Sequence, residues 1–210
     1  MARYTTPNDP MMDVEETRGV ANPIPLGLSV LAFTTAILGA YYAGFIIPYQ
    51  TTGSQIVVGA IILIGGIVQM LAGMWEFRRN NTIAATVFTS YGGFLAALGL
   101  VLLPGINIFG LLGGVAHLAL GLFFLCWTIF TAVLLVGALR TNRLLIAILS
   151  LLFVSYLVLT IGHLARENRI LLGIGGWIGI ICALVAWYAA MVSMTGGTRN
   201  LEESLHIPVR

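Results

Sequence analysis

The chain has 210 residues, of which 59% are hydrophobic and 9% are charged, and its formal net charge is +2. A soluble domain carries about 25% charged residues, so most of this protein's surface cannot face water. The net charge is small, and the basic residues are arginines that are scattered along the chain, without any lysine. Both features argue against a nucleic-acid partner. The composition therefore predicts a protein whose main partner is the lipid bilayer.

The start of the chain is polar, and an apolar run follows it. We expect residues 1–21 to form a cytoplasmic N-terminal tail, because they hold several acidic residues and little apolar content. In the sequence NPIPLGL that follows, Asn22 is a natural N-cap, and Pro23 and Pro25 fall where a first helical turn needs no N–H donor. These residues mark the beginning of the first long helix.

Several apolar runs are long enough to cross a membrane. A hydrocarbon core about 30 Å thick needs roughly 20 apolar residues per helix, and a β-barrel would instead alternate apolar and polar residues. We therefore predict an all-α integral membrane protein with six transmembrane helices in one domain, residues 22–194. The helices are expected at 26–47, 55–77, 83–103, 110–139, 144–165 and 171–194.

The placement of arginine predicts the orientation. Eight of the ten arginines lie in the two termini and in the second and fourth loops. Because cytoplasmic loops are enriched in basic residues, both termini are expected in the cytoplasm, including a C-terminal tail at 195–210. The protein is thus predicted to be multi-pass, in the inner or plasma membrane.

Glycine is concentrated inside the predicted helices. Doublets occur at Gly65–Gly66, Gly92–Gly93, Gly113–Gly114 and Gly175–Gly176, and Gly110 and Gly114 are spaced four residues apart. Small residues at this spacing let helix backbones approach closely. We expect these glycines to pack helices within or between subunits, with the lining of a narrow passage as the alternative.

Ionisable side chains are rare within the predicted helices. Glu76 lies beside Arg78 and Arg79 at a helix end, which favours an interfacial ion pair and leaves a proton relay as the second interpretation. His117 and His163 are expected near the outer ends of the fourth and fifth helices. Packing at the interface is the first interpretation of these two histidines, and proton carriage is the second.

Uncharged polar side chains are the remaining candidates for a substrate lining. Gln69 is nearest the middle of the membrane, and Thr34, Thr35, Thr89 and Ser90 add hydroxyl groups. Such hydroxyls mostly bond their own helix backbone, so only a cluster from several helices would indicate a passage. The two cysteines are each in an apolar run, and we predict neither a metal nor a cofactor.

Four segments carry a resemblance to a known family. NPIPLGL (22–28), GGIVQMLAGMWEF (65–77), FTSYGGF (88–94) and GGWIGIICA (175–183) resemble, in order, the motifs of the acetate uptake transporter family, also called the succinate–acetate permease or YaaH family. The resemblance implies a six-helix subunit, a homohexamer with a pathway through each subunit, and passage of acetate and related monocarboxylates, with succinate in some members. Asn22, Pro23, Pro25 and Gly27 are the structural residues of the first motif.

The same resemblance implies a constriction. In the family, the pathway narrows at a phenylalanine on the first helix, a tyrosine on the third and a leucine on the fifth. These positions fall on Leu31, Tyr91 and Leu152, so this chain departs from the family pattern at Leu31. The smaller side chain there predicts a changed shape of the constriction.

We therefore expect proton-linked membrane transport of acetate and similar acids rather than catalysis. Glu76 and His163 are the candidates for a proton link. A channel for small neutral solutes or ammonia is the main alternative, because an uncharged pathway would also suit them. A membrane hydrolase using Ser90 with a histidine, and a purely structural oligomer, are further alternatives, although neither GxSxG nor HExxH occurs.

Overall fold

The computed structural model describes residues 21–46, 55–103 and 111–195, and these residues fold entirely as helices and short turns. Six helices in these ranges are long and apolar enough to cross a membrane, which confirms the prediction of an all-helical chain with six candidate spans. The expected tails at 1–21 and 195–210 lie almost wholly outside the described residues. So do Gly110 and the loops around 48–54 and 104–107.

The observed helices follow the predicted runs, with shifted ends. The first span is α2 (Ile24–Ala43). The third to sixth spans are α5 (Thr82–Val101), α7 (Ala116–Ala138), α8 (Arg143–Leu164) and α9 (Arg169–Met194). A short 3-10 turn, η3 (Gly113–Val115), precedes α7. The second span is divided into α3 (Gln55–Ala60), the π-helix η2 (Ile61–Val68) and α4 (Gln69–Arg78). We did not expect the π-helix, which contains the Gly65–Gly66 doublet.

Local side-chain chemistry explains several of these ends. Asn81, Asn142 and Asn168 each accept a hydrogen bond from a backbone N–H in the first turn of α5, α8 and α9. At its other end, α2 stops four residues before the predicted 47. Gly44 there adopts φ +67°, and this left-handed conformation ends the helix although the apolar sequence continues.

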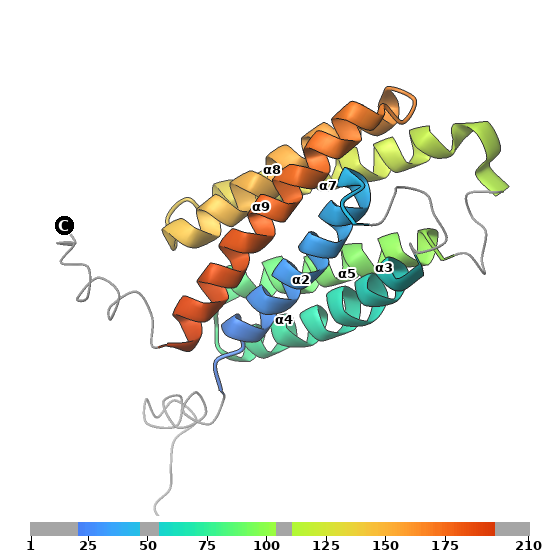
Figure 1. Ribbon diagram of the computed structural model, residues 1–210. Helices are drawn as coiled ribbons and strands as arrows, with labels where there is room; N and C mark the ends of the chain where they lie inside the picture. The colour runs from blue at the N-terminus through green and yellow to red at the C-terminus, as the bar shows by residue number, and fades with distance from the viewer. Residues whose placement is uncertain (1–20, 47–54, 104–110, 196–210) are drawn as a thin grey trace, which may run out of the picture.

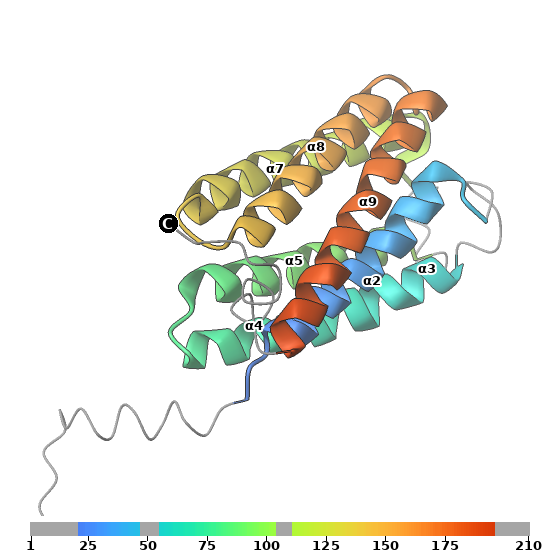
Figure 2. The same ribbon diagram turned by 60° about the vertical axis from the view of Figure 1, so that its left-hand side comes forward.

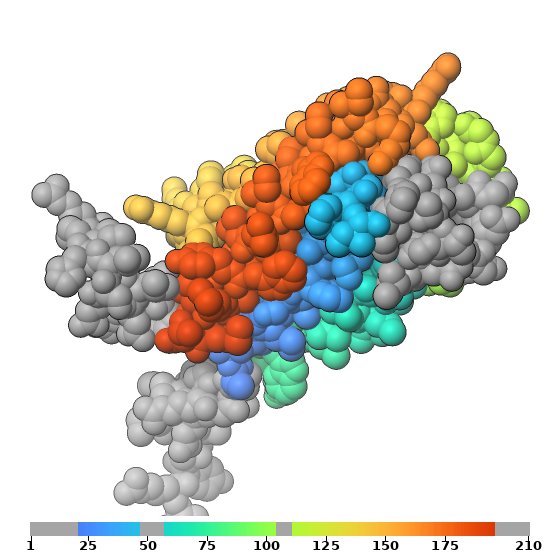
Figure 3. All heavy atoms as spheres, in the orientation of Figure 1, coloured from blue at the N-terminus to red at the C-terminus, as the bar shows by residue number. Residues whose placement is uncertain are grey.

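The helices form two groups of three, joined mainly by α2 and α9 (Figures 1 and 2). One group is α2, the composite second span and α5, and the other is α7, α8 and α9. In Figure 2, α7 and α8 lie above α4 and α5, and α9 crosses beside α2. The space-filling view shows α2 and α9 side by side along one face (Figure 3). We call the end of the bundle where α2 begins the proximal end, and the opposite end the distal end.

Glycines bring α2 and α9 into backbone contact. A Cβ atom added to Gly176 would lie 2.5 Å from the carbonyl oxygen of Gly39 and 2.4 Å from the backbone nitrogen of Ala43. Neither atom can move without shifting α2. The expectation that the glycines pack helices within a subunit therefore holds for this pair.

Gly176→Ala is expected to destabilise the fold, because the added methyl group overlaps the backbone of α2. Overpacking of this kind costs about 1–3 kcal/mol, and a lower melting temperature in detergent would report it. Gly173→Ala is the matched control on the same helix, since a Cβ atom there meets nothing within 4 Å. Equal melting temperatures of the two variants would contradict the role assigned to Gly176.

Candidate functional site

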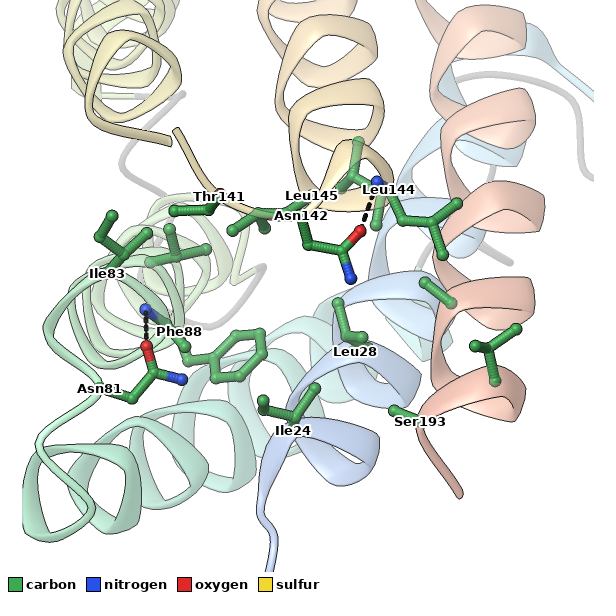
Figure 4. A pocket seen from close by; sticks show the side chains of 15 residues that line it. Ile24, Leu28, Asn81, Ile83, Phe88, Thr141, Asn142, Leu144, Leu145 and Ser193 are labelled. Atoms are coloured by element: carbon green, nitrogen blue, oxygen red, sulfur yellow. Dashed lines mark hydrogen bonds between the residues drawn. The ribbon is translucent and has the colours of Figure 1, made fainter. Parts of the chain in front are cut away.

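A cavity of about 270 Å³ opens at the proximal end, between α2, α5, α8 and α9. Its lining is mostly apolar, and Figure 4 shows Phe88 and Leu28 reaching into the space while the amide of Asn142 points into it from the start of α8. The other polar residues that line it are Asn81, Thr141 and Ser193. The cavity therefore offers amides and hydroxyls, without a charged side chain, to whatever enters it.

A second, much smaller cavity lies deeper, between α2, α8 and α9. Its volume of about 10 Å³ is close to the minimum for one water molecule. Thr35, Tyr42, Ser155 and Tyr156 contribute its polar lining, and the remaining lining consists of Leu38, Leu152, Leu159 and the glycines Gly39, Gly175, Gly176 and Gly179. Some glycines that pack the helices thus also line a hollow.

The three residues of the expected constriction fall between or beside these cavities. Leu31 lies one turn beyond Leu28 of the proximal cavity and one turn before Thr35 of the deep cavity. Leu31, Tyr91 and Leu152 are all 0% exposed. The two hollows are therefore separated by packed side chains at this level.

Tyr91 is held in place by residues that the sequence reasoning missed. Its hydroxyl lies 2.9 Å from the hydroxyl of Thr131 on α7, and its ring packs edge-on against Trp127, with a centroid distance of 5.1 Å. Tyr156 of α8 lies on another side, at 6.3 Å between centroids. Polar and aromatic residues within the α7 and α8 runs were the available signal, but their facing direction required the fold.

The hydroxyl residues expected to line a passage divide into two groups. Thr34 and Ser90 donate to carbonyl oxygens one turn earlier, of Val30 at 2.8 Å and Thr86 at 2.6 Å, as membrane hydroxyls usually do. Thr35 instead lines the deep cavity. The expected hydroxyls do not all converge on one site.

Gln69 and Thr89 are buried polar groups without a hydrogen-bond partner among the described residues. Both side-chain atoms of the Gln69 amide and the Thr89 hydroxyl are in this state, and Gln69 is 0% exposed. Gly65 packs against Leu95 and Gly73 against Thr89, so Gln69, midway between those glycines, lies near the level of Tyr91. Buried unpaired amides are costly, so a water or a passing ligand would stabilise this one.

The residues of the NPIPLGL motif build the proximal start of α2. The helix begins at Ile24, two residues before the expected start at 26, and Pro23 rather than Asn22 occupies the N-cap position. The side chain of Asn22 accepts a hydrogen bond from the Ile24 N–H at 3.2 Å. Pro25 follows within the first turn, as expected. A Cβ atom on Gly27 would overlap the ring of Phe88, so this glycine lets the FTSYGGF motif pack against α2.

A polar cluster joins α4, α5 and the segment before α2 at the proximal end. Glu76, 0% exposed, forms an ion pair with Arg79 at 3.4 Å and accepts a hydrogen bond from the Asn81 amide. Arg79 also donates to the side chain of Asn22. The expected ion pair is present, although Arg79 makes it rather than Arg78, which lies over the ring of Trp75.

His163 is buried near the distal end of α8. Its Nε2 atom lies 3.1 Å from the hydroxyl of Tyr42, and its ring stacks on Phe124 with an interplanar angle of 7°. The side chain is 0% exposed. The sequence placed this residue correctly along the helix but could not supply either partner.

The fold and the motifs agree with the comparisons to known proteins. A model of the GPR1/FUN34/yaaH family matches residues 5–207. The chain belongs to this family. It is 35% identical to the succinate-acetate/proton symporter SatP of Escherichia coli strain K12, over 82% of this chain and 87% of SatP. The structure of the bacterial acetate channel SatP matches with a TM-score of 0.74 and 33% identity, over 91% of this chain and 99% of that chain.

Two fungal relatives are longer than this chain. Acetate permease A of Emericella nidulans is 35% identical over 88% of this chain but only 65% of its own length. The ammonia transport outward protein 2 of Saccharomyces cerevisiae is 36% identical over 81% of this chain and 60% of its own length. The chain thus spans less than two thirds of these relatives.

Membership of the GPR1/FUN34/yaaH family confirms the resemblance carried by the four motifs. The relatives described above are named as a symporter, a channel, a permease and a transport protein, which argues against the hydrolase alternative. The geometry agrees, because the hydroxyl of Ser90 donates to the Thr86 carbonyl in its own helix.

Arg79→Gln should destabilise the protein, because it leaves the carboxylate of Glu76 buried without its cationic partner. Breaking a fully buried pair costs about 3–5 kcal/mol, and the partial exposure of Arg79 should reduce this to roughly 1–3 kcal/mol. Thermal unfolding in detergent measures the effect. Arg78→Gln is the control, and a loss in that variant equal to the loss in Arg79→Gln would contradict the assignment.

Proposed function

We propose that this chain transports acetate and related small monocarboxylic acids across the membrane, with succinate as a second substrate class. The observation that carries the proposal is the succession, along the bundle, of an uncharged proximal cavity, a buried level that contains Leu31 and Tyr91, and a narrow deep cavity. Relatives named for acetate and succinate transport are similar to this chain in sequence, and the bacterial acetate channel SatP has the same fold.

The constriction favours the neutral acid over the anion. An isolated carboxylate in a medium of low dielectric constant is penalised by tens of kcal/mol in the Born limit. Keeping an acid with a pKa of about 4.3 protonated at pH 7 costs only about 3.7 kcal/mol. Passage of the neutral acid is equivalent to moving one anion together with one proton, so transport should be proton-linked.

Each residue at the narrow level has a role in this proposal. Leu31 and Leu152 exclude water and set the permitted size, while the hydroxyl of Tyr91 offers a hydrogen bond to the acid as Thr131 releases it. Gln69 and Thr89 are buried polar groups nearby that a carboxyl group could satisfy. Glu76 instead acts structurally, since Arg79 and Asn81 already bind its carboxylate.

Orientation and assembly complete the proposal. We place the proximal end in the cytoplasm, because Arg78, Arg79, Arg140 and Arg143 gather at that end of the helices. The outward faces of α7 and α9 carry exposed apolar side chains such as Val133, Ile181 and Leu184, which suit lipid or a second subunit. By family resemblance we propose a homohexamer with one pathway per subunit.

Ammonia is the second candidate substrate. The similarity to the ammonia transport outward protein 2 favours it, and a small neutral molecule would also pass an uncharged route. Uptake of radiolabelled acetate into proteoliposomes separates the two candidates when butyrate, succinate and ammonium are tested as competitors at constant pH. Acetate uptake above that of empty liposomes, reduced by butyrate rather than by ammonium, supports the proposal, and protein-dependent ammonia flux without acetate uptake contradicts it.

Tyr91→Ala should widen the constriction and admit larger acids. We expect the ratio of butyrate to acetate uptake to rise about tenfold, the size of effect that one methylene group in a pocket can produce. The measurement is competitive uptake in proteoliposomes.

The control for Tyr91→Ala is Tyr188→Ala, because Tyr188 is 45% exposed on α9 and lines neither cavity. Leu31→Phe should act in the opposite sense to Tyr91→Ala and lower the uptake of butyrate relative to acetate. An unchanged selectivity in both Tyr91→Ala and Leu31→Phe would show that these residues do not set the size limit.

A further inference from the structure

The imidazole of His163 has one nitrogen engaged and one without a partner. Nε2 lies 3.1 Å from the Tyr42 hydroxyl, whereas Nδ1 is buried with no hydrogen-bond partner among the described residues. Stacking on Phe124 fixes the plane of the ring. A buried nitrogen in this state needs a ligand or a water, because an unmade hydrogen bond in the interior is costly.

His163 lies between two hollows. Its partner Tyr42 lines the deep cavity together with Thr35 and Ser155. The next residue along α8, Leu164, lines a separate hollow at the distal end, together with His117 and Arg166. The imidazole therefore lies between a residue that lines the deep cavity and a residue that lines the distal hollow.

We propose that His163 exchanges a proton with the carboxyl group of the transported acid at the distal end of the pathway. This inference rests on the proposed function. A carboxylate arriving from the distal hollow accepts a hydrogen bond from Nδ1–H of the imidazolium. The proton then moves from Nδ1 to the carboxylate oxygen, leaving a neutral imidazole and a neutral acid. The reverse transfer releases the anion.

The hydrogen bond to Tyr42 suits both protonation states. When the imidazole is charged, Nε2–H donates to the Tyr42 oxygen. When Nδ1 has given up its proton, the same Nε2–H bond persists, so Nδ1 is left as the acceptor for the O–H of the acid. The pair thereby keeps Nδ1 as the atom that exchanges the proton.

Other ionisable groups surround the pair. Arg169 of α9 donates to the backbone carbonyl oxygen of Tyr42 at 3.1 Å, and His117 of α7 is close enough to His163 to interact electrostatically. Arg166 and Glu167 form the turn after α8, where the Glu167 N–H donates to the His163 carbonyl at 3.4 Å. The arginines favour an approaching anion.

The test is equilibrium exchange of radiolabelled acetate in proteoliposomes with equal pH on both sides. His163→Gln keeps an amide near the position of Nε2 but cannot carry a proton. Exchange by His163→Gln should fall at least about tenfold at pH 7, where acetate arrives as the anion, because positioned acid–base groups contribute that much or more. Near pH 4.5, where about half of the acid is already neutral, exchange should change less than about twofold.

Tyr188→Gln is the control, since Tyr188 is 45% exposed on α9 and lines neither cavity nor the distal hollow. It should leave both rates close to those of the unmodified protein. An unchanged rate in His163→Gln, or an equal fractional loss at both pH values, would overturn the inference. If His163→Gln does not fold, Tyr42→Phe is measured instead. A loss of acetate exchange confined to neutral pH supports the inference, and an equal loss at both pH values or no loss overturns it.

The unmodified protein separates this inference from the proposed function. Absence of acetate exchange above that of empty liposomes would overturn both. Exchange that persists with the same pH profile in His163→Gln would overturn only the role of His163.

Discussion

The backbone contact between α2 and α9 is the interaction on which the rest of the structure depends. Gly39 and Gly176 bring the two helices close enough that a single added methyl group would overlap main-chain atoms. In a bilayer, apolar side chains gain little from meeting one another, so close packing of small residues is a main source of helix association. This contact joins the two groups of three helices, and the deep cavity lies directly beside it.

The pathway follows from the way the two groups meet. Residues spaced one or two turns apart on α2 and α8, such as Leu28 and Thr35, line different hollows and leave Leu31 buried between them. Tyr91 is fixed by Thr131 and Trp127 of the other group. A level that is packed, uncharged and supplied with a hydroxyl group transmits a neutral acid far more readily than an anion.

The sequence predicted some of these features and not others, for physical reasons. Continuous apolar runs of bilayer length predict the spans well, because lipid offers no hydrogen-bond partner to the backbone and a helix satisfies its own N–H and C=O groups. The early end of α2 was missed because hydropathy continues past Gly44, although the glycine itself was visible. The partners of Tyr91, Gln69 and His163 could not be predicted, because they depend on the register between helices that are distant in the sequence. The ion pair of Glu76 was predictable, since both charges lie on adjacent turns of one segment.

The central claim is that acetate crosses together with a proton, so no net charge moves. The most direct measurement follows acetate accumulation and membrane potential together in proteoliposomes that have equal acetate on both sides and an imposed pH step. The account predicts uphill accumulation on the alkaline side that exceeds the leak of empty liposomes and leaves the potential unchanged. Flux that carries net negative charge and does not respond to the pH step would contradict it.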